Sequence, residues 1–562
     1  MKLQSPLSSV LCLLASAGSV LGVSGPFLTQ LNESAWVFGN EIWNVTQYQT
    51  FATKLWYDER DLVGDAVGHY VSYNGAASNF NWTSASVTAN TSTYLDIAFS
   101  AIEGDMHWVI YPDLAGAYQY FVNHGLPVLG EFRTLWRLDN TTFPKGRTNV
   151  KDEELPALSE YSAATKIQDE TWERADGTFI TKYDWTAWTR TWDFYGVYGE
   201  DAGSWYINPG KDYYNGNQLK QELTVHRESS TGDAVQLNML HGTHFMASSS
   251  DVFSDGKIWG PWLWYLNNGS KADAEARKTE EFSSWPYAWF DNAWYHNRAA
   301  AVKGSISLSD GRPASGAAVF LGDNNPNKTA LDMGGGYYYT TYADADGIFS
   351  FEHVLAGTYG LQAWSNGSAI ADVSTSLLVN NVQVPSSNGS VDIGAHVWRL
   401  NDRRRLFQLG DFDRKALGFK YGGAPYQHAL VDRCPANLTY TVGKSNTSDW
   451  CFAQSANGTA QILFDVDAVS NQTAVLTVSL GGFSAGTNAE ITLNGAKVGN
   501  LSSLASDQSL YRSATAAGEW RLLEFSFAGN LFRKGSNSLA FTVKNSTKWR
   551  GWIWDSIILE WA

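Results

Sequence analysis

The stretch that decides the fold and the chemistry of this chain runs from Gly177 to Trp264. It opens with Gly177-Thr-Phe-Ile-Thr-Lys-Tyr-Asp-Trp185 and later reads Val235-Gln-Leu-Asn-Met-Leu-His-Gly-Thr-His244. Apolar and polar residues alternate here, and glycines bound the runs, which is typical of β-strands in a half-buried sheet. The pattern predicts strands that line a groove, with Lys182 and His244 as the foremost chemical groups.

Outward from this stretch, short alternating runs extend over most of the 562 residues and predict an all-β protein. Residues 1–22 combine a basic start, an apolar run and small residues, which predicts a cleaved secretory signal peptide and no membrane anchor. We expect residues 23–298 to form a large N-terminal β-sandwich that carries the catalytic site. Residues 299–397 predict a small fibronectin III-like or carboxypeptidase-regulatory-like sandwich, and residues 398–562 a galactose-binding-like jelly roll.

Two further features favour a secreted, extracellular protein. Asn-x-Ser/Thr sequons recur along the chain, as at Asn81 and Asn140, and predict a glycosylated surface. Cys12 would leave with the signal peptide, so Cys434 and Cys451 remain. A disulfide between these two is expected in an oxidising compartment, with two free thiols as the alternative.

Charge and composition narrow the class of partner. The formal net charge is −16 and the aromatic content is 14%, with 25 tryptophans. An acidic chain of this kind argues against nucleic acid, although a few positioned arginines and lysines can still bind an anionic substrate. Tryptophan stacks on the apolar faces of sugars, which favours a carbohydrate ligand, whereas packing in the core of a β-sandwich is the alternative use.

Several longer motifs carry a resemblance to a known family. They include His69-Tyr-Val-Ser-Tyr73, Phe132-Arg-Thr-Leu-Trp-Arg-Leu138, Ile180-Thr-Lys-Tyr-Asp-Trp185, Gly203-Ser-Trp-Tyr-Ile207 and Lys257-Ile-Trp-Gly-Pro-Trp-Leu-Trp-Tyr265. Together they resemble the secreted rhamnogalacturonan lyases of polysaccharide lyase family 4, along the whole mature chain. The resemblance implies a rhamnogalacturonan endolyase (EC 4.2.2.23). Such an enzyme cleaves the rhamnogalacturonan I backbone of plant cell-wall pectin by β-elimination.

The resemblance also implies the bond and the catalytic residues. The family cleaves rhamnose-(1→4)-galacturonate bonds and leaves an unsaturated galacturonate at the non-reducing end. Lys182 matches the family's catalytic lysine and His244 its catalytic histidine, with His241 as the alternative. β-Elimination needs a base for the C5 proton and an acid for the leaving oxygen, and both residue types suit either task. The sequence leaves open which is base, which is acid, and whether cleavage is endo or exo.

Substrate-binding residues are expected on neighbouring strands. Arg133 and Arg137 are four residues apart and so share one face of a strand, where both can reach an anionic sugar chain; structural ion pairs are the alternative. The family places tyrosines shortly before the catalytic histidine, but here that segment reads Gln236-Leu-Asn-Met239. The tyrosine role is therefore expected to move to other residues, namely Tyr206, Tyr213 and Tyr214.

Two other classes of protein stay open at this level. A glycoside hydrolase needs a pair of carboxylates, for which the central stretch offers Asp184, Asp193, Glu200, Asp201, Asp212 and Glu222. A non-catalytic carbohydrate-binding protein is the other alternative. No metal-binding motif stands out, so we expect no required cofactor, and a structural calcium ion is an alternative to which no residues are assigned. We expect a monomer.

Overall fold

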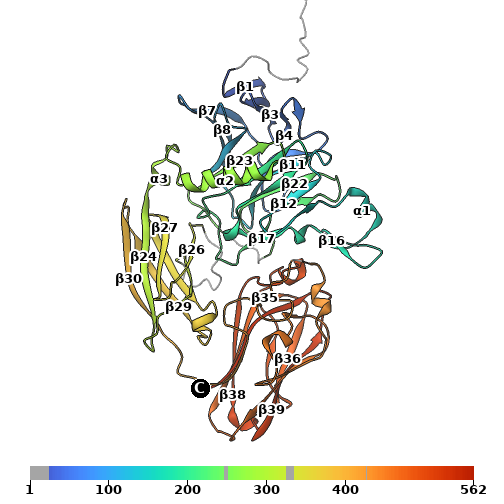
Figure 1. The fold of residues 1–562 in the computed structure, drawn as a ribbon, viewed down its shortest axis with the longest axis vertical. Helices are drawn as coiled ribbons and strands as arrows, with labels where there is room; N and C mark the ends of the chain where they lie inside the picture. Colours follow the sequence, from blue (N-terminus) through green and yellow to red (C-terminus); the bar gives the residue numbers. More distant parts are fainter. Residues whose placement is uncertain (1–23, 246–250, 325–334, 426) are drawn as a thin grey trace, which may run out of the picture.

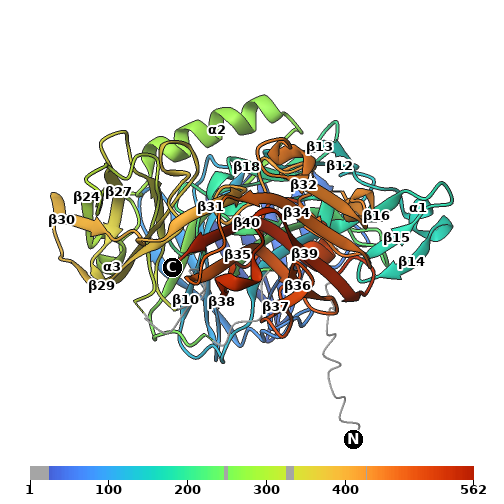
Figure 2. The ribbon, with the colours of Figure 1, turned by 90° about the horizontal axis from the view of Figure 1, so that it is seen from below.

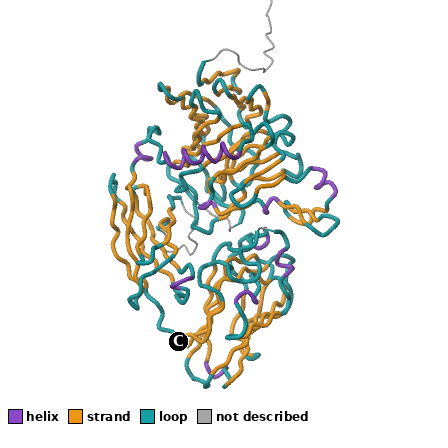
Figure 3. Tube along the Cα trace, viewed as in Figure 1, coloured by secondary structure: helices purple, strands orange, loops and turns teal. Residues whose placement is uncertain are grey.

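The computed structural model describes residues 24–245, 251–324, 335–425 and 427–562; the predicted signal peptide, residues 1–22, lies outside this part of the chain. Strands dominate the described chain (Figure 3), so the prediction of an all-β protein built from several sandwiches is confirmed. In that same part, no helix has both the length and the apolar character needed to cross a membrane. Figure 1 shows the N-terminal sandwich at the top, a small sandwich to one side and the C-terminal sandwich below.

The N-terminal sandwich is built from two large antiparallel sheets. The first contains, in spatial order, β1 (Phe27–Asn32), β2 (Ala35–Gly39), β3 (Trp43–Tyr48), β4 (Ala52–Tyr57), β6 (Gly68–Tyr73), β11 (Phe132–Leu138), β22 (Ala234–His241) and β21 (Val225–Arg227), with β5 (Arg60–Asp61) paired to β4. The second contains β13 (Asp152–Glu154), β12 (Lys145–Arg147), β18 (Phe194–Tyr198), β19 (Gly203–Ile207), β23 (Ile258–Asn267), β10 (Gly116–Asn123), β9 (Gly104–Ile110), β8 (Leu95–Ala101) and β7 (Ser84–Asn90). Strands β11 and β22, distant in sequence, are therefore neighbours.

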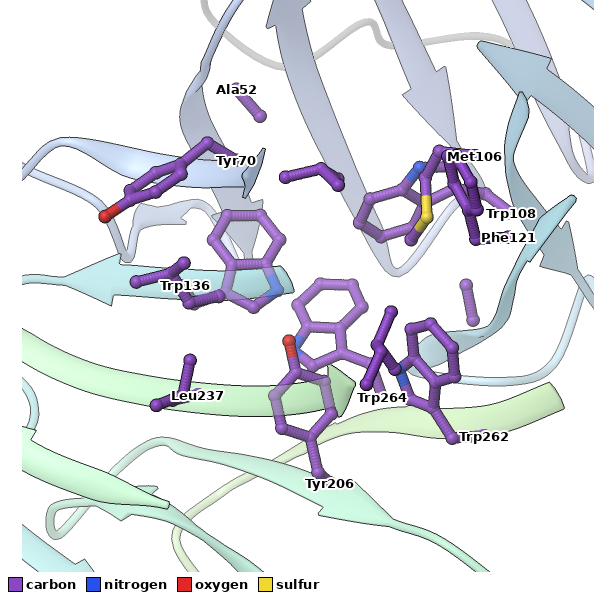
Figure 4. Packing of buried hydrophobic residues seen from close by; sticks show 14 of the residues in the cluster. Ala52, Tyr70, Met106, Trp108, Phe121, Trp136, Tyr206, Leu237, Trp262 and Trp264 are labelled. Atoms are coloured by element: carbon purple, nitrogen blue, oxygen red, sulfur yellow. The ribbon is translucent and has the colours of Figure 1, made fainter. Parts of the chain in front are cut away.

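Large aromatic side chains fill the space between these sheets (Figure 4). The Trp136 ring from the first sheet stacks on the Trp264 ring from the second, with centroids 4.9 Å apart and 22° between the planes. Trp108 meets the Trp264 ring edge-on at 5.8 Å. Much of the tryptophan that favoured a sugar ligand in the sequence thus packs the core, where offset and edge-to-face pairs stabilise the fold.

Short elements project from the sandwich toward the C-terminal part (Figure 1). They are α1 (Leu158–Ala163), β14 (Thr165–Gln168), β15 (Thr171–Glu173), β16 (Phe179–Thr181), the 3-10 turn η1 (Lys182–Asp184), β17 (Thr186–Trp188), η2 (Thr189–Thr191) and β20 (Gln221–Leu223). Lys182 follows the strand and does not lie within it, because β16 ends at Thr181. The Thr181 hydroxyl accepts the Tyr183 N–H at 3.3 Å and starts the turn. Serine and threonine cap helical turns in this way.

The helices α2 (Lys271–Ser284) and α3 (Ala293–His296) lead into the middle module. One of its sheets contains β27 (Ile348–Leu355), β24 (Arg298–Leu308) and β30 (Ser390–Trp398). The other contains β26 (Tyr339–Tyr342), β25 (Ala318–Gly322), β28 (Gly357–Trp364) and β29 (Ser376–Val384), with η3 (Ser368–Ile370) nearby in the chain. These sheets enclose a separate hydrophobic cluster, which includes Trp398.

The C-terminal sandwich also has two sheets. One contains β31 (Arg404–Leu409), β40 (Gly551–Trp561), β35 (Thr473–Ser484) and β38 (Arg521–Ala528), with β33 (Ala453–Gln454) paired to β40. The other contains β32 (Leu438–Thr441), β34 (Thr459–Val466), β39 (Gly535–Asn545), β36 (Asn488–Leu493) and β37 (Ala496–Leu501). Its connections hold η4 (Leu430–Arg433), η5 (Thr447–Asp449), η6 (Leu510–Arg512) and η7 (Gly529–Leu531). The predicted Cys434–Cys451 disulfide is present.

The C-terminal sandwich packs directly against the N-terminal one, as the two views of Figures 1 and 2 agree. Its hydrophobic cluster includes Tyr183 and Phe245 from the N-terminal sandwich. The N–H of Gln508 donates to the Phe245 carbonyl at 3.1 Å, and the Gln221 side-chain amide donates to the Ala517 carbonyl at 2.9 Å. This contact therefore involves the segments that hold Lys182 and His244.

Candidate active site

His244 lies in a turn that follows β22. Gly242 has φ +78°, and a Cβ there would come within 2.3 Å of the Gly130 carbonyl oxygen, so the turn requires glycine. Nδ1 of His244 lies 2.5 Å from Oε1 of Glu222, and Oε2 of Glu222 accepts the His244 N–H at 2.9 Å. These two contacts fix the orientation of the imidazole and direct its Nδ1–H to the carboxylate. Nε2 is then the ring nitrogen left for a ligand.

Glu222 sets the electrostatics of this histidine. The residue is fully buried. Burial acts to raise the pKa of the Glu222 carboxyl, but the charge and hydrogen bond of His244 outweigh it and hold the pKa below the usual 4.5. A carboxylate that stays ionised beside an imidazole stabilises the protonated ring. The pair therefore suits His244 to carry and deliver a proton.

The surroundings of Lys182 favour its neutral amine, the form that can act as a base. Its Nζ lies 5.4 Å from the centroid of the Tyr183 ring and has no hydrogen bond or ion pair among the residues that the structure describes. Burial lowers the pKa of the Lys182 ammonium from 10.5; the charges of Glu170 and Asp169 oppose this shift, and that of Arg512 adds to it. A lowered pKa increases the fraction of neutral amine that can accept a proton.

The two predicted arginines share the outer face of strands β11 and β22, the face turned away from the second sheet. Gln236 faces that second sheet, because its Oε1 accepts the Ser204 hydroxyl at 2.6 Å. Trp136 is the cross-strand partner of Gln236 and points the same way. Since side chains alternate along a strand, Arg133 and Arg137 point to the outer face. The prediction that both arginines lie on one face is confirmed.

Each arginine also contacts other protein groups, as expected if the arginines form structural ion pairs, the alternative that the sequence left open. Arg137 donates from Nε to Oδ2 of Asp233 at 2.7 Å. Arg133 donates from Nε to the Ser72 hydroxyl at 3.0 Å, and its nearest carboxylate, that of Glu131, is 3.6 Å from Nη1. Arg133 is thus the less neutralised of the two and the better candidate to bind an anion.

His226, which the sequence did not single out, lies on the strand β21 beside the predicted residues. In the sheet it is the cross-strand partner of Val235, which is also the partner of Arg137, so the three share the outer face. Strand β21 also contacts η1, which begins with Lys182. Burial lowers the pKa of the His226 imidazole well below 6.5, and the charges of Lys182, His244 and both predicted arginines lower it further. One neutral side chain thus has all four predicted ionisable residues around it.

The C-terminal sandwich contributes Arg512, at the end of η6. Its Nη1 donates to the His244 carbonyl oxygen at 2.6 Å, and its Nη2 donates to Oδ2 of Asp169 at 2.7 Å. The guanidinium carbon lies 4.8 Å from the centroid of the Tyr183 ring. Arg512 therefore holds the His244 turn through the carbonyl group, whereas Glu222 holds it through the N–H and the ring. Sequence patterns could not find this contact, because the partners are 268 positions apart.

The three tyrosines predicted to bind substrate lie elsewhere. Tyr206 and Tyr214 have no exposed surface and Tyr213 is 1% exposed, all within the core of the N-terminal sandwich. Figure 4 shows Tyr206 beside Trp264, and the Tyr214 hydroxyl donates to Oδ1 of Asn238 at 2.5 Å. The expectation that these tyrosines contact substrate is therefore corrected, because their rings fill the space between the sheets. Their position in an aromatic-rich motif reflected packing.

His241, the alternative catalytic histidine, is also in the interior. It has no exposed surface, and its Nε2 lies 2.9 Å from Oδ2 of Asp251. Burial lowers the pKa of His241 to about 4. Of the two histidines in this segment, His244 is the one grouped with Lys182 around His226.

Several carboxylates that a hydrolase would need are held in ion pairs. Asp193 pairs with Arg147 at 2.6 Å, Asp212 with Arg298 at 2.6 Å, and Glu222 with His244. Glu200 and Asp201 are exposed in the turn between β18 and β19. Within residues 24–245, 251–324, 335–425 and 427–562, no group of three or more His, Cys, Asp or Glu side chains is arranged to hold a metal ion.

Comparison with known proteins finds two matches to family models, both C-terminal to the N-terminal sandwich. The model of polysaccharide lyase family 4, domain II, matches residues 309–385, and that of domain III matches residues 405–559. These matches, together with the relatives below, support a polysaccharide lyase.

Its curated relatives are, more narrowly, rhamnogalacturonate lyases. One, named rhamnogalacturonate lyase, from Dickeya dadantii (strain 3937), is 29% identical over 80% of this chain and 78% of its own length. A probable rhamnogalacturonate lyase B from Aspergillus niger is 23% identical over 86% of this chain and 79% of its own. The resemblance recognised in the sequence motifs is confirmed.

Proposed function

We propose that this protein cleaves the rhamnogalacturonan I backbone of pectin by β-elimination at rhamnose-(1→4)-galacturonate bonds, as an endolyase. One observation carries the proposal: a lysine with a lowered pKa and a histidine held by a buried glutamate lie around the same buried side chain, His226. The names of the curated relatives support the substrate.

In the proposed reaction, the neutral amine of Lys182 takes the C5 proton of galacturonate. The electrons of that C–H bond form the C4=C5 double bond, and the C4–O4 bond breaks. Burial supports this role, because desolvation favours the uncharged amine. A base of this kind contributes about 10²–10⁴-fold to the rate.

As the C4–O4 bond breaks, its electron pair stays on O4, and the imidazolium of His244 delivers a proton from Nε2 to that oxygen. The ionised Glu222 at Nδ1 supports this role, because it stabilises the charged ring before transfer. After the step Lys182 is protonated and His244 is neutral, so a proton passing between them through solvent restores the starting state. We propose that no cofactor is required, because the elimination transfers only protons and Arg133 is the proposed cation for the galacturonate carboxylate.

The galacturonate carboxylate must be neutralised for C5 to become acidic. Arg133 is the proposed partner, since its nearest protein carboxylate is 3.6 Å away, whereas Arg137 is bound to Asp233 at 2.7 Å. Guanidinium binds carboxylate with two parallel hydrogen bonds and stays charged at all relevant pH values.

The test is to incubate the protein with native and carboxyl-reduced rhamnogalacturonan I and follow ultraviolet absorption of the product. We expect a conjugated, unsaturated uronate from the native polymer and very slow turnover of the reduced polymer. Shortened chains without ultraviolet absorption would indicate a hydrolase. Unchanged chain length with retained binding would indicate a binding protein.

We also propose that the protein is secreted, glycosylated and monomeric. The Cys434–Cys451 disulfide supports secretion, because such bonds persist in oxidising compartments. Recovery of the chain from culture medium with a new N-terminus near residue 23 would agree with this proposal. Retention of residues 1–22 in an intracellular protein would contradict it.

A further inference from the structure

A hollow opens between the N-terminal and C-terminal sandwiches. Its volume is about 820 Å³, which is within the range of roughly 300–1,000 Å³ that ligand sites in proteins occupy. Lys151, Asp184 and Trp188 line it from the N-terminal sandwich. Tyr421 and Arg433 line it from the C-terminal sandwich. We call this space the interdomain hollow.

The interdomain hollow is adjacent to the candidate active site but separate from it. None of the lysine, histidine or arginine side chains that surround His226 is among its lining residues. Lys182 and Asp184 stand at opposite ends of η1, and only Asp184 lines the hollow. Ala187 of β17 lines it too, and its cross-strand partner is Glu222, which holds His244. The β17–β20 ribbon therefore separates the two sites: β17 lines the interdomain hollow, and β20 supports His244 in the candidate active site.

Asp184 provides an acceptor that protein groups leave unused. Its Oδ1 is buried and has no hydrogen-bond partner within the described chain. Burial raises the pKa of the Asp184 carboxyl to about 7, against the opposing effects of Lys151, the Ser513 hydroxyl and the His428 backbone. A buried oxygen without a partner is costly, so such an atom is expected to meet a donor from a ligand or from ordered water. Sugar hydroxyls are donors of this kind.

Other walls of the hollow offer a flat apolar surface and positive charge. Trp188 is partly exposed, and Arg433 is exposed and has no ion pair in the described part of the chain. Nζ of Lys151 lies 4.4 Å from the centroid of the Trp185 ring and 3.6 Å from Glu153. An indole stacks on a sugar face, and separated single cations suit widely spaced carboxylates better than a dense anion such as phosphate.

We propose that the interdomain hollow is a second carbohydrate site, which binds an acidic oligosaccharide. A sugar ring stacks on Trp188, a hydroxyl donates to Asp184, and separate uronate carboxylates meet Arg433 and Lys151. The choice of alternating rhamnose and galacturonate as the ligand rests on the proposed function. The ligand comes from one of two sources, either a further stretch of the polymer held in the active site or a released fragment.

The test is calorimetric titration of the full chain with a rhamnose–galacturonate tetrasaccharide, in a Lys182→Ala background that prevents turnover. We expect two binding events, one of which weakens about tenfold or more, equivalent to ~1.4 kcal/mol, on adding Trp188→Ala or Arg433→Ala. Matched controls are Trp294→Ala and Arg404→Ala, which change exposed residues outside the hollow. Arg433 is exposed, so its replacement keeps the test valid if the Trp188 variant fails to fold.

Steady-state rates distinguish the two sources of the ligand. They are measured with proteins that keep Lys182. If the hollow binds a further stretch of the polymer held in the active site, Arg433→Ala should raise KM for long polymer more than KM for the tetrasaccharide. The ratio of the two KM values then rises above that of the parent. If the hollow binds a released fragment, Arg433→Ala should leave the ratio of the two KM values unchanged, while the second binding event is lost from the calorimetric titration. Identical titrations for parent, Trp188→Ala and Arg433→Ala proteins overturn the inference. If the parent yields no unsaturated product yet still shows a Trp188-dependent binding event, the proposed lyase reaction fails and the second site stands.

Discussion

The outer and inner faces of strands β11 and β22 use the same backbone for opposite purposes. The outer face carries Arg133 and Arg137, and each has polar partners at the surface of the sandwich. The inner face carries Trp136, which is fully buried and stacks on Trp264. Because side chains alternate along a strand, one residue step separates the proposed chemistry from the core. The comparison teaches that outer-face positions can carry ionisable residues for function. Inner-face positions are constrained by packing.

The strongest test of this comparison replaces the two proposed catalytic residues. Lys182→Ala and His244→Ala should each reduce kcat on the order of 10²–10⁴-fold, as expected for loss of a general base or acid. The double variant should be little slower than either single one, because residues that act as a unit are not additive. Initial rates of ultraviolet product formation measure this effect. Lys182→Arg keeps the charge but cannot supply a neutral amine, so retained activity in that variant would rule out Lys182 as the base.

The next test changes the inner face. Trp136→Ala should reduce the free energy of unfolding by about 3–5 kcal/mol, because it leaves a cavity under the sheet. Arg133→Ala, one face away, should leave the denaturant midpoint close to that of the parent, but it should lower kcat and raise KM, because the galacturonate carboxylate loses its proposed cation. Urea unfolding followed by tryptophan fluorescence measures the first effect, and initial rates measure the second. Equal destabilisation by both replacements would remove the distinction between the faces.

Glu222→Gln probes the support of His244. The amide keeps a hydrogen-bond acceptor but loses the charge that stabilises the imidazolium of His244. We expect kcat to fall about 10–100-fold, the usual effect of removing a residue that orients a functional histidine. Asp193→Asn, which alters a carboxylate paired with Arg147, is the control.

Arg512→Ala tests whether the C-terminal sandwich completes the site. Loss of the hydrogen bond to the His244 carbonyl should reduce kcat about tenfold, equivalent to ~1.4 kcal/mol, since the turn then has one anchor fewer. Binding of a short oligosaccharide in the Lys182→Ala background should change little. Arg404→Ala provides a control for removal of an exposed arginine. An Arg512→Ala enzyme with parent kcat would show that Glu222 alone is sufficient to position His244.

The smallest expected effect concerns stability and pH. The pKa of Lys182 is lowered from 10.5 in the folded protein, so its protonated form disfavours folding. Lys182→Met should therefore raise Tm at neutral pH, where the unfolded-state lysine is protonated. The gain should shrink as pH rises through 10.5, because the lysine then becomes neutral in the unfolded state too. A Tm difference that is independent of pH would contradict this origin.

How much of the site was predictable depends on how local its signals are. Lys182 and His244 lie in motifs long enough to be recognised, and Arg133 and Arg137 share a face through strand periodicity alone. Glu222 was visible as a carboxylate, yet its role as the partner of His244 depended on a turn at Gly242. The tyrosine prediction failed because an aromatic-rich stretch is the same whether its rings line a groove or fill a core.

The sequence by itself determined the all-β class, the Cys434–Cys451 pair and the residues of the proposed chemistry, because periodicity and motif are properties of neighbouring residues. Only the tertiary structure decided that His226 lies among those residues, and that Arg512 reaches the turn of His244 from another sandwich. Such contacts join segments distant in the chain. Their formation depends on which strands pair and which surfaces pack, and no local pattern encodes that outcome.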